Sequence, residues 1–215
     1  GFDYSRLHES NQRAPGKNRG NSGKRNRRAG LSTGMAAIML VMELFKPGDH
    51  LIVDADLYGG SIRLFDNVSR KTGFSFRIDC WKEDVESYVN ENTKAIYIET
   101  PTNPMMNVTD IAALADIAKR HDLLLIVDNT FLSPYFQNPL NLGADIVVHS
   151  GTKFLGGHND TLAGFLVTNR AHISEKLRFL IKTTGSGLAP FDSWLILRGY
   201  QTLGIRMEQA QKMLQ

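Results

Sequence analysis

Residues 123–128 read Leu-Leu-Leu-Ile-Val-Asp, an almost continuous apolar run that ends in an acid. A short run without alternating polar residues is typical of a parallel strand that is buried on both faces. Working outward from it, we expect further strands at Ala144–His149 and Ala163–Val167 downstream, and at Leu51–Asp54, Phe74–Ile78 and Lys94–Glu99 upstream. Strands of this kind need helices to cover both faces of their sheet.

The segments between these runs have the apolar spacing of helices. We expect helices over the apolar stretch Met35–Phe45, then Ser61–Lys71, Ile111–Arg120 with Thr109 as its N-cap, Ile173–Lys182 and a long one over Phe191–Met213. Alternating strands and helices predict the α/β class, with a mostly parallel sheet covered on both faces. In such sheets the ligand crevice lies where the strands end. The chain places Asp54, Glu99, Asp128 and His149-Ser150 there.

The composition narrows the class of protein. With 215 residues, 42% of them hydrophobic, the chain can bury the core of one large domain. It has no apolar run long enough to cross a bilayer and no signal-peptide pattern, so we expect no membrane partner. Its single cysteine, Cys80, cannot form an internal disulfide, which favours a cytoplasmic location.

The net charge of +3 conceals a strong asymmetry. Eight of the 25 Lys and Arg residues but only two of the 22 acids lie in residues 1–30, so this segment carries +6 and the rest of the chain −3. Within residues 7–30, Leu7 is the only large apolar residue. Such a composition is typical of a disordered segment or a nucleic-acid-binding arm.

Two strand ends carry residues suited to a phosphorylated aldehyde. Ser150-Gly151-Thr152-Lys153 sets two hydroxyls around a lysine: hydroxyls and turn amides bind phosphate, and the lysine could react with the aldehyde. Asp128 ends the most hydrophobic run, where a desolvated carboxylate needs a cationic partner such as a protonated pyridine nitrogen. The alternatives are an ordinary polar turn at Ser150 and a turn-capping carboxylate at Asp128.

A longer series of motifs resembles one family. It consists of Asp128-Asn129-Thr130-Phe131, Pro134-Tyr135-Phe136-Gln137, Pro139-Leu140, Leu142–Val147, His149–Lys153 and Gly157-His158-Asn159-Asp160. In order and spacing it resembles the Cys/Met-metabolism, or transsulfuration, enzymes that depend on pyridoxal 5'-phosphate (PLP). That family includes cystathionine β-lyase, γ-lyase and γ-synthase, and methionine γ-lyase. The resemblance covers nearly all of residues 31–215.

The resemblance implies a fold and a cofactor site. The fold would be the large domain of a fold-type-I PLP-dependent transferase, without the small C-terminal domain. Lys153 would carry the cofactor as a Schiff base and move protons, and Asp128 would pair with the pyridinium nitrogen. The phosphate would be bound by the hydroxyls of Ser150 and Thr152 and by the backbone amides of Gly34 and Met35.

Further contacts are implied around the cofactor ring. Tyr58 would stack on the ring and assist proton transfer, Asn103 would bind the ring hydroxyl, and Thr130 would lie against the other side. Tyr4 and Arg6 match a motif that reaches the phosphate of a neighbouring subunit, which implies a homodimer or homotetramer with shared sites. We expect no metal, because the spacing of His50, Asp54 and Asp56 is unconvincing.

The expected function follows from the family. We expect a PLP-dependent carbon–sulfur lyase that cleaves cystathionine by β- or γ-elimination, acting on a small sulfur amino acid. The alternatives are γ-replacement on an O-acylhomoserine, as in cystathionine γ-synthase, and an inactive truncated or frameshifted fragment. The arginine that binds the substrate carboxylate in this family lies outside the chain.

Residues 7–30 depart from the family pattern. The family continues with an Asn-Pro-Thr-Arg-like loop and a helix with Leu-Glu pairs. When codons permitted for residues 7–30 are read one nucleotide later, they can yield both features, which suggests two compensating frame changes. A nucleic-acid-binding arm would need aromatic residues or a recognition element, so we expect no nucleic-acid partner. The domain prediction is therefore an arm over residues 1–30, and over 31–215 a PLP-binding domain with the start of the interdomain helix.

Overall fold

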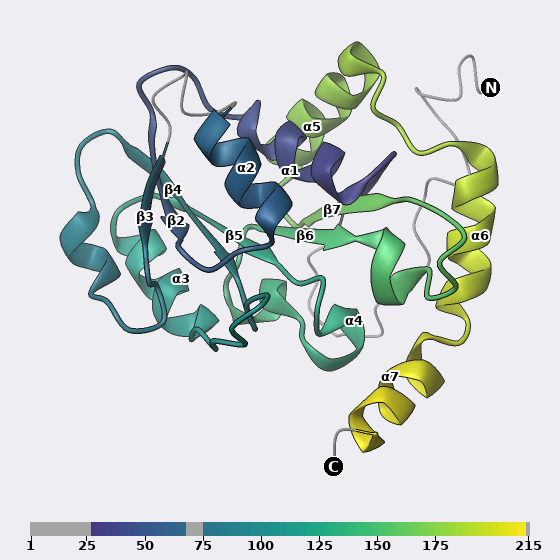
Figure 1. Cartoon of the computed structure of the whole chain (residues 1–215). Helices are drawn as coiled ribbons and strands as arrows, with labels where there is room; N and C mark the ends of the chain where they lie inside the picture. Colours follow the sequence, from purple (N-terminus) through teal and green to yellow (C-terminus); the bar gives the residue numbers. More distant parts are fainter. Residues whose placement is uncertain (1–26, 68–74, 214–215) are drawn as a thin grey trace.

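The computed structural model describes residues 27–67 and 75–213. The expectations for Tyr4, Arg6 and residues 7–26 lie outside this range. In the described part, seven strands form one sheet in the order β1-β7-β6-β5-β4-β2-β3 (Figure 1). The strands are β1 (Arg27–Leu31), β2 (His50–Asp54), β3 (Ser75–Ile78), β4 (Thr93–Glu99), β5 (Leu124–Asp128), β6 (Ile146–Ser150) and β7 (Gly164–Thr168).

The sheet is mostly parallel, as predicted. Strands β3, β2, β4, β5 and β6 run parallel, whereas β7 and β1 are antiparallel to their neighbours. Parallel neighbours bring the carboxyl ends of β2, β4, β5 and β6 to the same edge of the sheet. The polar residues that end these strands are therefore brought near one another.

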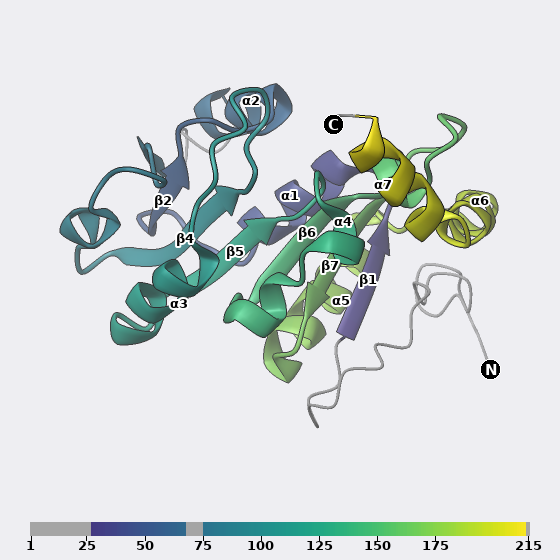
Figure 2. The same ribbon diagram turned by 90° about the horizontal axis from the view of Figure 1, so that it is seen from below.

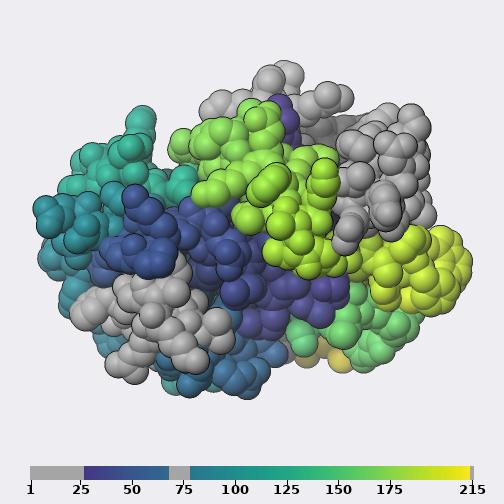
Figure 3. Space-filling view, turned by 90° about the horizontal axis from the view of Figure 1, so that it is seen from above, coloured from purple at the N-terminus to yellow at the C-terminus, as the bar shows by residue number. Residues whose placement is uncertain are grey.

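Helices cover both faces of the sheet (Figure 2). On one face lie α1 (Gly34–Met42), α2 (Gly59–Asn67) and α5 (Ala171–Thr184), and Figure 3 shows α5 beside the purple α1 on that side. On the other face lie α3 (Ile111–Arg120) and the short helix η4 (Pro139–Leu142). The remaining helices are η3 (Val85–Tyr88), α4 (Ser133–Phe136), η5 (Gly151–Leu155), α6 (Pro190–Tyr200) and α7 (Leu203–Lys212).

The strands divide their side chains between two cores. On β4, Ala95 and Tyr97 join the core under α1, whereas Ile96 and Ile98 join the core under α3. Successive strand residues face opposite sides of a sheet. The same alternation assigns Glu99 to the α1 face with Tyr97.

Three features of the fold differ from the sequence prediction. The N-cap of α3 is Asp110 rather than Thr109, because the Asp110 carboxylate accepts hydrogen bonds from the first turn of the helix. The helix predicted over Phe191–Met213 is two helices, α6 and α7, since the Thr202 hydroxyl and the Arg206 guanidinium both donate to the Gly199 carbonyl at the break. Strand β1 was not predicted, and it lies partly inside the segment expected to be an arm.

A close approach between β7 and α1 requires glycine at position 164. A Cβ built on Gly164 would overlap the carbonyl group of Thr33, the residue that caps α1. We therefore expect Gly164→Ala to destabilise the chain by about 1–3 kcal/mol, the typical cost of overpacking. Gly59→Ala is the matched control, because a Cβ there meets nothing within 4 Å. Urea denaturation of both variants checks this, and equal stability of the two would contradict it.

Candidate functional site

A cavity of about 250 Å³ lies at the carboxyl ends of β4, β5 and β6, beside the N-terminus of α1. Residues from six segments of the chain line it. The lining consists of Thr33, Gly34, Met35, Ile38, Tyr58, Glu99, Asn103, Asp128, Thr130, Ser150, Thr152, Lys153 and Leu162. Its place in the sheet is where ligands bind in open α/β folds.

The N-terminus of α1 forms one wall of the cavity. Thr33 caps the helix, and its Oγ1 accepts a hydrogen bond of 2.9 Å from the Ala36 amide. The amides of Gly34 and Met35 precede the first intrahelical bond and carry the positive end of the helix dipole. A Cβ on Gly34 would lie 2.9 Å from the Ser150 Cβ, so this glycine lets the helix start next to the Ser150 hydroxyl. A helix N-terminus and a hydroxyl together suit a phosphate.

Asp128 provides a buried carboxylate at the floor of the cavity. Its Oδ1 accepts hydrogen bonds from the Thr130 hydroxyl at 2.6 Å and the Thr130 amide at 3.0 Å, and the Ser150 amide donates to Thr130 Oγ1 at 2.8 Å. Burial raises the pKa of Asp128, while the donors of Thr130 and the nearby Tyr97 hydroxyl lower it. Among the described residues Asp128 has no cationic partner. The site therefore fits a ligand with a positively charged nitrogen.

Lys153 lies where the chain leaves β6. The strand ends at Ser150 and enters η5, within which Lys153 has a non-helical backbone (φ −86°, ψ −128°). Lys153 is exposed and lines the cavity, whereas the neighbouring Thr152 hydroxyl accepts a hydrogen bond of 3.1 Å from the Ala163 amide. An amine thus faces the same space as the Asp128 carboxylate.

Tyr58 and Asn103 reach the cavity from two loops. Tyr58 precedes α2 and is half exposed, and its backbone amide donates to Glu99 Oε2 at 2.8 Å. Asn103 lies in the loop between β4 and α3. Asp56 holds this loop, because its carboxylate accepts hydrogen bonds from the Thr102 hydroxyl and the Met105 amide. An aromatic ring and an amide side chain are therefore available beside the amine.

Every described residue that was predicted to contact the cofactor lines this one cavity, while Tyr4 and Arg6 lie outside the described range. Sequence reasoning missed Thr33, Ile38 and Leu162 as lining residues, and it placed Glu99 at this edge of the sheet without giving it a role in the site. For Glu99 a signal existed, because the residue ends a strand whose neighbour ends in Asp128. Nothing in the sequence marks Leu162.

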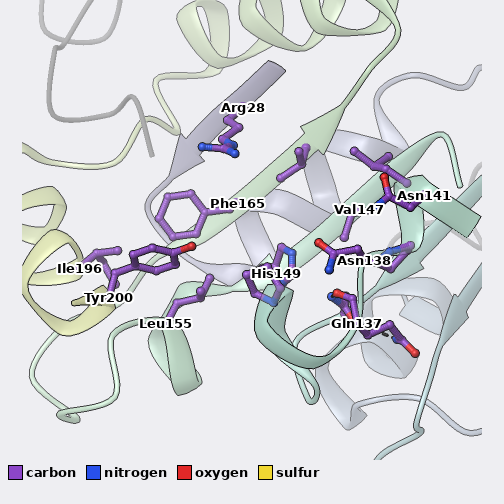
Figure 4. Close-up of a pocket in the computed structure, with 15 residues that line it drawn as sticks. Arg28, Gln137, Asn138, Asn141, Val147, His149, Leu155, Phe165, Ile196 and Tyr200 are labelled. Atoms are coloured by element: carbon purple, nitrogen blue, oxygen red, sulfur yellow. Dashed lines mark hydrogen bonds between the residues drawn. The ribbon is translucent and has the colours of Figure 1, made fainter. Parts of the chain in front are cut away.

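A second cavity, of about 90 Å³, opens on the other face of β6 and β7 (Figure 4). His149 lines it together with Arg28 of β1, Phe165 and Tyr200. Burial lowers the pKa of His149 to about 4, so the ring is neutral at pH 7, and its Nδ1 has no hydrogen-bond partner. Although His149 precedes Ser150 and was expected at the same crevice, it lines this second cavity and not the first.

The described residues form neither a metal-binding cluster nor a membrane-spanning helix. No group of three or more metal-binding side chains gathers in residues 27–67 and 75–213. Within the same ranges, the helices are too short or too polar to span a bilayer.

Comparison with known proteins identifies the family. The sequence model of one protein family, the Cys/Met metabolism PLP-dependent enzymes, matches residues 1–215. The chain belongs to this family. The cofactor of the family is PLP, whose ring nitrogen, aldehyde and phosphate match the groups that the cavity presents.

Several members of the Cys/Met metabolism family are similar to the chain. It is 48% identical over 98% of its length to the cystathionine gamma-synthase/O-acetylhomoserine (thiol)-lyase of Bacillus subtilis, covering 57% of that protein. It is 53% identical over 82% of its length to the cystathionine gamma-lyase of the same organism, covering 47%. A cystathionine beta-lyase of Lactococcus lactis is 49% identical over 82% of the chain and is covered to 47%.

A solved structure agrees with this assignment. The cystathionine gamma-lyase from Lactobacillus plantarum, complexed with L-serine, matches with a TM-score of 0.81 and 48% identity over 83% of the chain, which covers 47% of that structure. The chain thus spans about half the length of the relatives that it matches. Over the part that it covers, the chain has the fold of these PLP-dependent enzymes.

Proposed function

We propose that the whole protein is a PLP-dependent carbon–sulfur lyase of sulfur amino-acid metabolism that cleaves cystathionine in the cytoplasm. The observation that carries the proposal is the cavity in which Lys153, Asp128 and the N-terminus of α1 meet. The similarity to a gamma-lyase and a beta-lyase at about 50% identity supports the substrate class. The buried, unpaired Cys80 supports a reducing compartment.

In this proposal the chain holds PLP at three points. The Lys153 amine would be attached through the cofactor's aldehyde, the Asp128 carboxylate would accept a hydrogen bond from the ring nitrogen, and the phosphate would lie at Ser150 and the start of α1. Thr152 would complete the phosphate site through its hydroxyl. When bound, PLP supplies an electron sink for the bonds at the α-carbon of the substrate.

The side chains around these points would orient the ring and move protons. The Lys153 amine would remove the α-proton of the substrate. Tyr58 would stack on the ring and assist proton transfer, and Asn103 would donate to the ring oxygen. Thr130 would lie against the opposite side while its hydroxyl keeps Asp128 hydrogen-bonded.

The partner subunit belongs to the same proposal. Tyr4 and Arg6 would reach the phosphate of a neighbouring copy, so the functional unit would be a homodimer or homotetramer with shared sites. The substrate carboxylate would be bound by an arginine outside the chain.

Product analysis of the full-length protein with L-cystathionine tests the reaction. Homocysteine with pyruvate would establish β-elimination, and cysteine with 2-oxobutyrate would establish γ-elimination. Formation of neither product by folded, PLP-loaded protein would overturn the lyase proposal.

A second candidate reaction is γ-replacement, as in cystathionine γ-synthase. The match over 98% of the chain to a relative named for that activity favours it. Cystathionine formed from cysteine and an O-acylhomoserine, with no cleavage of cystathionine, would decide for it.

We also propose that residues 7–30 result from two compensating frame changes. The composition of residues 7–30, in which Leu7 is the only large apolar residue, supports this. The nucleotide sequence tests the proposal: we expect an extra base near codon 7 and a missing base near codon 31, and an uninterrupted gene reading as the chain does would contradict it.

A further inference from the structure

Glu99 is a buried acid of the cavity to which the predicted site assigns no role. It ends β4, is 5% exposed, and lies in register with Asp128 on β5. Paired residues of neighbouring parallel strands face the same side of the sheet. Two carboxyl groups therefore line one cavity, but they have different partners.

The partner of Glu99 is the backbone of Tyr58. Glu99 Oε2 accepts the Tyr58 amide at 2.8 Å, and the Tyr58 carbonyl accepts the amides of Ser61 at 2.8 Å and Ile62 at 3.2 Å. Tyr58 is thus the residue from which α2 begins. The hydrogen bond from the Tyr58 amide to Glu99 Oε2 therefore joins the end of β4 to the start of α2.

The Tyr58 ring is confined on a second side. A Cβ built on Gly60 would overlap the ring and crowd the Met35 sulfur. Because Gly60 has no side chain, the Tyr58 ring can occupy this position. The hydrogen bond to Glu99 fixes the backbone of Tyr58. We propose that Glu99 is a positioning residue that holds Tyr58 over the PLP site. The proposal rests on the proposed function of the cavity.

The protonation of Glu99 makes the role testable with a matched variant. Burial raises the pKa of Glu99 to about 8, and the nearby Asp128 adds to this rise, whereas the Tyr58 amide opposes it. Asp54, Asp56, Tyr97 and Lys153 are the other titratable groups near or facing Glu99. At pH 7 the side chain is therefore a neutral acid, and glutamine reproduces its shape, its charge and its acceptor oxygen.

The experiment compares Glu99→Gln and Glu99→Leu at pH 7, with Glu175→Leu on the exposed side of α5 as the control. Hydrogen exchange measures the Tyr58 amide, and absorbance titration measures PLP affinity. We expect the glutamine variant and the control to match the wild type. We expect the leucine variant to exchange the Tyr58 amide faster and to bind PLP about fivefold more weakly, the loss that one hydrogen bond typically causes.

Unchanged exchange and unchanged affinity in the leucine variant would overturn the positioning role. If the wild-type chain binds no PLP, the proposed cofactor site is wrong. The exchange rate of the Tyr58 amide then still tests whether Glu99 holds Tyr58. If the leucine variant does not fold, Glu99→Ala replaces it with the same two measurements, and unchanged exchange and affinity would again overturn the proposal.

Discussion

Replacing Lys153 by alanine is expected to abolish the covalent retention of PLP after borohydride reduction. Among the residues that the structure describes, Lys153 is the only lysine that lines the cavity, and a lysine amine can form the reducible bond with the cofactor's aldehyde. Peptide mass spectrometry of the reduced protein locates the modified residue. In the full-length enzyme we expect the rate of product formation to fall by at least about 10³-fold, since a group that transfers protons contributes this order of magnitude alone.

The control is Lys119→Ala, which removes an exposed lysine from α3. It should leave the adduct at Lys153 unchanged. A stoichiometric adduct that persists at another lysine in Lys153→Ala would contradict the assignment. Folded wild-type chain that yields no adduct would favour the alternative of an inactive fragment.

How far the sequence predicts this fold depends on how each strand is buried. Strand β5 was predicted because both of its faces are covered, so all of its residues except the final Asp128 are apolar. Strand β1 reads Arg-Arg-Ala-Gly-Leu and has no such pattern. Its pairing with β7 uses backbone groups, from Arg27 opposite Thr168 to Leu31 opposite Gly164, and these are available whatever the side chains are. A local pattern therefore cannot reveal β1.

Residue chemistry in the sequence also could not identify every residue of the candidate site. His149 and Ser150 both end β6 and both carry chemically capable groups. The alternation of the strand nevertheless sends Ser150 to the cavity beside α1 and His149 to the opposite face. The resemblance singled out Ser150, whereas residue chemistry alone could not separate the two. Glu99 had both the chemistry and the position, but its role depends on a contact with Tyr58 that only the folded chain brings about.

Asp128→Asn should separate a cofactor-binding role from a structural one. The amide keeps an oxygen that can accept the Thr130 hydrogen bonds, but it removes the negative charge that would face the ring nitrogen. Breaking a buried ion pair by neutralising one partner costs about 3–5 kcal/mol. We therefore expect PLP affinity and the rate of the full-length enzyme each to fall by at least about 10²-fold. Absorbance titration and steady-state kinetics measure the two losses.

The same substitution should not weaken the chain without PLP. Burial raises the pKa of Asp128 above 3.8, so the folded chain holds this proton more tightly than the unfolded chain does. Stability then falls as the pH rises from about 4 toward the folded pKa, and the asparagine variant lacks this loss. Urea denaturation at pH 7 should find Asp128→Asn at least as stable as the wild type and as the exposed control Asp116→Asn. If the variant lost stability together with PLP affinity, Asp128 would instead be a structural residue whose carboxylate secures the turn at Thr130.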